Sequence, residues 1–86
     1  MPEISRFFGI AIRMYFDDHN PPHFHAIYEG REIQVSINPI QILQGSLPTR
    51  ATSMVLEWAA LHQHELAENW HRLKHAQAPA KIMPLE

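Results

Sequence analysis

The chain has 86 residues, of which 45% are hydrophobic and 19% are charged, and its net charge is −2 with neutral histidine. This length and composition predict one globular domain rather than a disordered chain. No apolar run approaches the roughly 20 residues of a membrane-spanning helix, and we see no export signal, so we expect a cytoplasmic protein with no membrane partner. Cysteine is absent, which excludes disulfides and thiolate metal sites.

The seven lysines and arginines are spread along the chain without a cluster. A protein that binds nucleic acid through phosphate contacts alone normally carries a basic patch. The composition therefore argues against a strong non-specific nucleic-acid binder. Its unusual feature is the seven histidines, because imidazole changes charge near neutral pH and binds transition metals.

The first half of the chain predicts β-structure. Hydrophobic and polar residues alternate along it, and glycines or prolines separate the alternating runs. The predicted strands are 3–8, 10–16, 23–29, 32–37 and 40–43. In the third strand, His23 and His25 point to one side of the sheet and Phe24 points to the other.

The second half predicts helix, because alanine, leucine and glutamate dominate after Pro48 and no glycine or further proline occurs before residue 79. This stretch is long for one helix, so a single rod and two helices with a break near 62–65 are both compatible with it. The expected fold class is α+β, an N-terminal antiparallel sheet of four to five strands packed against a C-terminal long helix or helix pair. We expect a single domain, with a β-meander over 1–45, a helical part over 48–77 and a tail over 78–86.

Three histidines, His19, His23 and His25, lie within seven residues and are separated by two prolines that stiffen the turn. Imidazoles in this arrangement are candidate ligands for zinc or another divalent transition metal, with Asp17 or Asp18 as an oxygen ligand. The same histidines are candidates for general acid–base catalysis. The third interpretation is that they are structural or solvent-facing residues of an outer strand face.

The helical half contains a second candidate group. On a helical wheel, His62 and Asn69 fall at the centre of the apolar arc and Glu65 falls at its edge. Buried polar groups without partners cost about 1–3 kcal/mol each, so these residues are expected to face a cleft or to bond loop carbonyls. The alternative is a helix break that rotates them out of the apolar arc. Trp58 and Trp70 bracket the arc and are interpreted as core or interface anchors.

The two candidate groups need not form one site. If Phe24 faces the helices, His23 and His25 face away from His62. The sequence leaves open whether the histidine turn curls over the sheet edge and joins them.

Four segments resemble a known family: PEISRFFGIAIRMYFDDHNPPHFHAIYEG, GSLPTRA, EWAALHQHELAENW and KIMPLE. From Pro2 to Leu85, the chain resembles the small prokaryotic family catalogued as domain of unknown function 4160. The positions that match the family pattern are His19, Pro21, Pro22, His23, Phe24, His25, Trp58, His62, Asn69 and Trp70. His64 stands where the family usually has an acidic residue, so the resemblance gives it no part in a shared site.

The resemblance implies no established activity. Genes of the resembled family often lie beside genes of a second small family, domain of unknown function 2442, and this pairing resembles a toxin–antitoxin operon. By this analogy the chain is expected to be the toxin-like component, with a small protein of the second family as its partner. Such a toxin is expected to act on RNA through acid–base chemistry of the histidines. The candidate catalytic residues are His19, His23, His25 and His62, with Asn69 as an orienting group.

The alternative is a non-enzymatic protein-binding module, whose contact surface would comprise Phe24, Trp58, Glu65 and Trp70, with or without zinc on the histidine turn. A third interpretation is a metal-dependent enzyme that uses the three histidines of the turn. The sequence leaves open whether the protein is an enzyme and whether it forms a homo-oligomer.

Overall fold

The computed structural model describes residues 3–86, which form a five-stranded antiparallel sheet followed by two helices. The strands and helices are β1 (Glu3–Phe7), β2 (Ile10–Arg13), β3 (His23–Tyr28), β4 (Arg31–Ile37), β5 (Ile40–Gly45), α1 (Thr49–Leu61) and α2 (Gln63–Lys74). Each strand pairs with the next one along the chain, so the sheet is a meander in the order β1-β2-β3-β4-β5. The predicted α+β class is confirmed.

A two-residue turn sets the register between β3 and β4. Glu29 and Gly30 have φ of 48° and 77°, which is the left-handed conformation that tight hairpin turns require. As a result, His25 lies directly opposite Gln34. This register decides which side chains of β4 can reach the histidines.

Alternation along β3 separates two faces, as predicted. Phe24 and Ala26 are fully buried, and Trp58 of α1 packs edge-on against Phe24 with ring centroids 5.8 Å apart. His23 and His25 therefore leave the sheet on the face opposite the helices. Helices and sheet together enclose one hydrophobic core.

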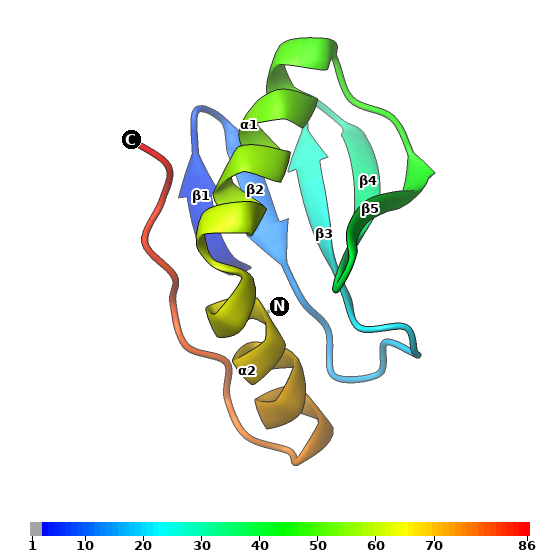
Figure 1. Cartoon of the computed structure of the whole chain (residues 1–86), viewed down its shortest axis with the longest axis vertical. Coiled ribbons are helices and arrows are strands. Elements are labelled where there is room, and N and C mark those ends of the chain that lie inside the picture. Colours follow the sequence, from blue (N-terminus) through cyan, green and yellow to red (C-terminus); the bar gives the residue numbers. More distant parts are fainter. Residues whose placement is uncertain (1–2) are drawn as a thin grey trace.

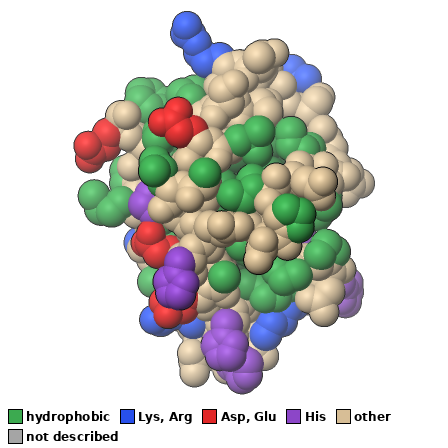
Figure 2. Space-filling view, viewed as in Figure 1, with side chains coloured by type: hydrophobic (Ala, Val, Ile, Leu, Met, Phe, Trp, Pro, Cys, Tyr) green, Lys and Arg blue, Asp and Glu red, His purple; other side chains and the backbone are tan. Residues whose placement is uncertain are grey.

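The helical segment is broken at His62, whose φ is −122°, so the two-helix alternative is confirmed. α1 crosses the face of the sheet, whereas α2 extends beyond the end at which β3 begins (Figure 1). Histidine side chains are visible over this α2 end of the molecule (Figure 2), where His64, His71 and His75 are exposed. No helix within residues 3–86 is long and apolar enough to cross a membrane.

The C-terminal tail runs beside β1, the outer strand of the sheet (Figure 1). The Ile82 amide donates a hydrogen bond of 2.8 Å to the carbonyl of Ile4, and the Ile82 side chain is buried. Asn69 of α2 holds the tail from the other side: its Nδ2 donates to the Ala80 carbonyl and its Oδ1 accepts from the Ala80 amide, both at 2.8 Å. The tail thereby closes this edge of the sheet.

Candidate metal centre

The segment between β2 and β3 brings an aspartate back to the start of β3. Asp18 is fixed by a turn in which its amide donates to the Tyr15 carbonyl at 3.4 Å. The Tyr15 amide donates in return to Asp18 Oδ2, also at 3.4 Å. On the other side, Lys74 Nζ of α2 donates to the main-chain carbonyl of Asp18. These contacts hold the carboxylate beside the two strand histidines.

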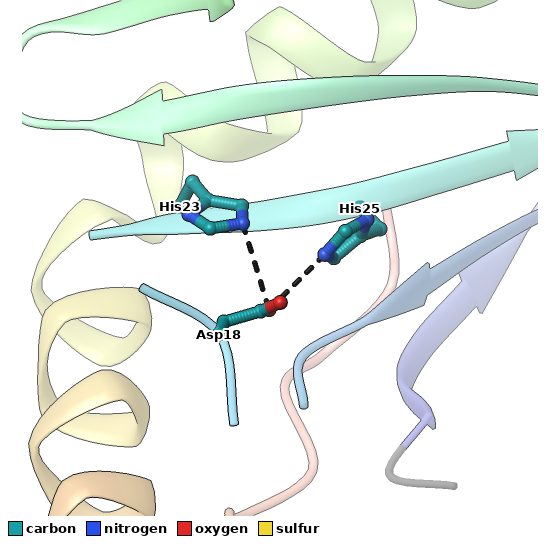
Figure 3. Close-up of side chains that lie close together, drawn as sticks. All are labelled: Asp18, His23 and His25. Carbon is teal, nitrogen blue, oxygen red and sulfur yellow. Dashed lines mark hydrogen bonds and ion pairs between the residues drawn. The ribbon is translucent and has the colours of Figure 1, made fainter. Parts of the chain in front are cut away.

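Asp18, His23 and His25 converge on one point (Figure 3). Asp18 Oδ2 lies 3.0 Å from His25 Nε2 and 3.5 Å from His23 Nε2. One potential ligand atom from each residue lies within 4.8 Å of those of the other two. The side chains are 16%, 9% and 8% exposed, respectively, so the cluster is shielded but close to the surface.

Hydrogen bonds on the far side of each ring define the protonation of the imidazoles. His25 Nδ1 lies 2.6 Å from Glu32 Oε2, and His23 Nδ1 lies 2.8 Å from the Pro21 carbonyl oxygen. A carboxylate and a carbonyl only accept hydrogen bonds, so both Nδ1 atoms carry a proton and donate it. In neutral rings, both Nε2 atoms are then unprotonated and direct lone pairs toward Asp18.

Three lone-pair donors facing one another repel unless a positive charge lies between them. With neutral imidazoles, the carboxylates of Asp18 and Glu32 also give the cluster two negative charges. A divalent cation would remove the lone-pair repulsion and neutralise these charges, and additional protons on the rings would do the same. Imidazoles that ligate a metal usually donate their other N–H to a carboxylate or a carbonyl, which is the arrangement of His25 with Glu32 and of His23 with Pro21.

Aromatic side chains pack against the two histidines of the cluster. Tyr15 packs edge-on against His25 with ring centroids 4.6 Å apart, and Trp70 of α2 packs against His23 at 5.4 Å. Lys74 Nζ lies 4.4 Å above the Trp70 ring. Because α2 extends past the end of the sheet, it contacts His23 through Trp70 and the Asp18 main chain through Lys74.

His19 and His62 lie outside this cluster. His19 is exposed and is not one of the three converging residues. His62 lies at the junction of the helices, where its Nδ1 is 2.5 Å from Glu65 Oε1 and its ring packs against Trp58 at 5.6 Å. Trp58 belongs to the helix-covered core, so His62 and Glu65 are on the other side of the sheet from His23 and His25.

The remaining predicted residues have identifiable packing partners. Phe24 and Trp58 are fully buried, and Trp58 Nε1 donates to the Met83 carbonyl at 2.8 Å. Both polar atoms of the Asn69 amide bond the main chain of the tail. Trp70 is the predicted aromatic residue that contacts the histidine cluster.

Sequence reasoning missed Glu32, Tyr15 and Lys74. Glu32 could have been found from the turn at residues 29–30, because that register places it on the same face as His25, diagonally across the strands. No local pattern predicts the Lys74 contact, since 56 residues separate it from Asp18.

The fold and the cluster define a small α+β protein with two histidines and an aspartate converging at the start of its central strand. The chain belongs to the family described as domain of unknown function (DUF4160), whose model matches residues 9–71. The matched range contains the whole cluster and its partner Glu32. No curated protein and no solved structure matches the chain.

Proposed function

We propose that this protein binds one divalent transition-metal ion, zinc by preference, through Asp18 Oδ2, His23 Nε2 and His25 Nε2. The observation that carries the proposal is the pair of Nδ1 contacts to Glu32 and the Pro21 carbonyl, because in neutral rings these contacts direct both Nε2 lone pairs at the Asp18 carboxylate.

The separations of the ligand atoms support this assignment. Metal–ligand bonds of about 2.0–2.1 Å in tetrahedral geometry place neighbouring ligand atoms roughly 3.3 Å apart. The distances of 3.0 and 3.5 Å from Asp18 Oδ2 to the two imidazoles bracket this value. The donor set of two imidazoles and one carboxylate suits zinc and, among other metals, iron.

Three protein ligands leave one or more coordination positions open. Structural zinc sites are normally closed by four protein ligands, whereas sites that activate water or bind substrate keep a position free. The proposed site is therefore of the open kind, and a ligand would enter it from the sheet face that the helices leave uncovered.

Elemental analysis of protein purified without a histidine tag tests the proposal. We expect about one zinc ion per chain, lost in the double variant His23→Ala, His25→Ala and in Asp18→Asn. The control is His71→Ala, His75→Ala, because these two exposed histidines have ring centroids 4.2 Å apart and could also chelate a metal. Loss of metal in the control but not in the double variant, or no metal in the wild type after zinc dialysis, would refute the site.

A second candidate function is metal-free acid–base catalysis on RNA, as expected of a toxin with a small cognate partner. The observation that favours it is that both ring nitrogens of His25 face carboxylate oxygens, Glu32 at 2.6 Å and Asp18 at 3.0 Å. Metal-free cleavage of RNA needs a base that accepts the 2′-hydroxyl proton and an acid that donates a proton to the leaving oxygen, and His23 and His25 are the pair of imidazoles for these roles.

Cleavage of RNA in the presence of a chelator separates the two candidates. Metal-free catalysis predicts activity that survives chelation, is abolished in His25→Ala and is blocked by the cognate protein. Activity that is lost on chelation and restored by zinc would instead support the metal centre.

A further inference from the structure

A row of polar residues crosses the open face of the sheet through the proposed metal centre. The register pairs Arg13 of β2 with His25 of β3, His25 with Gln34 of β4, and Gln34 with Gln44 of β5. Directly opposed residues project from the same face. His25 therefore lies in the row between an arginine on one side and two glutamines on the other.

At the Arg13 end of the row, one N–H group of the guanidinium has no hydrogen-bond acceptor among residues 3–86. Arg13 Nε is buried and has no acceptor, and its side chain forms no ion pair within the described chain. Its neighbour on β1, Glu3, has both carboxylate oxygens bound by Arg6 at 2.7 and 3.0 Å. The Arg13 side chain is only partly buried, and its buried Nε–H is a donor that an external anion could satisfy.

The other end of the row opens into a pocket of about 290 Å³, lined by Glu32, Gln34, Gln44 and Gly45. A carboxylate and two primary amides offer both acceptors and donors, and the carboxylate disfavours an anion. Neither glutamine side chain has a hydrogen-bond partner among the described residues. The pocket, at about 290 Å³, is just below the roughly 300–1,000 Å³ of small-molecule sites, so it suits one small, neutral, hydrogen-bonding ring.

We propose that this row binds a nucleotide, with its base in the glutamine pocket and its phosphate at Arg13. Glutamine amides pair with the donor and acceptor edges of bases, and arginine is suited to phosphate. Neighbouring strands are about 4.8 Å apart, so the two ends lie roughly 10–14 Å from each other, and their side chains shorten this distance. The proposal rests on the metal centre proposed above, because the sugar that joins the base to the phosphate would cross His25, beside the open coordination position.

Calorimetric titration of the zinc-loaded protein with nucleoside monophosphates, nucleosides and inorganic phosphate tests the row. We expect Arg13→Gln to weaken nucleotide binding by about tenfold or more and to leave nucleoside binding unchanged. Gln34→Ala, Gln44→Ala should weaken both nucleotides and nucleosides while leaving inorganic phosphate unaffected. The matched controls are Arg31→Gln, on the opposite face, and Gln41→Ala, on β5 outside the pocket, and both should bind like the wild type.

Two results would refute the proposed nucleotide site. One is inorganic phosphate that binds as tightly as every nucleotide. The other is equal nucleotide affinity in Arg13→Gln and Arg31→Gln. The same titration of metal-free protein distinguishes this failure from that of the metal centre. If no zinc binds but nucleotide affinity still depends on Arg13 and the glutamines, the metal centre fails and the row stands. Titration with a short oligoribonucleotide shows whether the natural ligand is an RNA strand or a free nucleotide. Tighter binding than the mononucleotide supports an RNA strand, and equal or weaker binding supports a free nucleotide.

Discussion

Gly45 illustrates how a single residue fixes the end of the sheet. Its φ is +83°, and an added Cβ would collide with the main-chain oxygen of Glu32. The left-handed conformation alone costs an L-residue about 1–2 kcal/mol, and relieving the collision requires the β4–β5 pairing to shift. We expect Gly45→Ala to lower the free energy of unfolding by more than this amount, measured by urea denaturation.

Gly30→Ala is the matched control for this prediction. Its φ is +77°, but an added Cβ would meet nothing within 4 Å. Gly30→Ala should therefore lower the free energy of unfolding only by the cost of the left-handed conformation, about 1–2 kcal/mol. Equal losses in the two variants would contradict a steric role of Gly45.

Glu32 is the residue on which the orientation of His25 depends, since its carboxylate accepts the 2.6 Å hydrogen bond from Nδ1. Removing such an outer partner typically lowers metal affinity by about 10- to 100-fold. We expect Glu32→Ala to do so for zinc, measured by competition with a chromophoric chelator. Glu57→Ala, an exposed glutamate of α1, should bind zinc like the wild type. A Glu32→Ala protein with undiminished affinity would show that the carboxylate does not orient the ligand.

At the scale of elements, the last turn of α2 is the part of the helix pair that contacts the proposed metal centre. Lys74 Nζ bonds the Asp18 carbonyl and lies over Trp70, which packs against His23. The helix thus contacts the main chain of Asp18 through Lys74 and the imidazole ring of His23 through Trp70. The 14–22 segment and α2 act together in positioning the three ligand atoms.

Lys74→Met should therefore weaken zinc binding by about tenfold. It should lower the free energy of unfolding by only about 1 kcal/mol, since Lys74 is exposed and loses one cation–π contact. The control, Lys81→Met, removes a similar bond from a lysine to a main-chain carbonyl, that of Glu3, at the far edge of the sheet. It should leave zinc affinity unchanged. If both variants lose affinity equally, the effect comes from charge and not from the position of Asp18.

At the scale of the whole molecule, the proposed zinc binding predicts a change in stability. Zinc at one hundred times its Kd would stabilise the folded chain by about 2.7 kcal/mol. For a domain of this size, that corresponds to a rise in Tm of roughly 10–20 °C. The rise should disappear in the His23→Ala, His25→Ala variant, as measured by thermal denaturation with and without zinc.

The same rise should shrink as the pH is lowered from roughly 7 to 5, because protons compete with the metal for the imidazole nitrogens. A zinc-dependent rise in Tm that is equal at both pH values would indicate binding at residues other than the histidines.

Much of the fold could be predicted because its determinants are local. Alternation placed Phe24 and the two histidines of β3 on opposite faces of the sheet, turn glycines located the hairpins, and the composition after Pro48 located the helices. These features depend on contacts within a few residues, which the sequence displays directly. The position of Glu32 beside His25 is harder to predict, because it follows from the turn at residues 29–30 only after the register of β3 and β4 has been worked out.

The sequence by itself therefore determined the order of elements, the two faces of β3 and the histidine pair that β3 presents. Only the tertiary structure decided that Asp18 rather than His19 joins this pair, that Lys74 supports it, and that Asn69 binds the tail. Each of these outcomes depends on where an irregular segment or a helix end packs against a distant strand. Such packing reflects the shape of the whole core, which no local periodicity records.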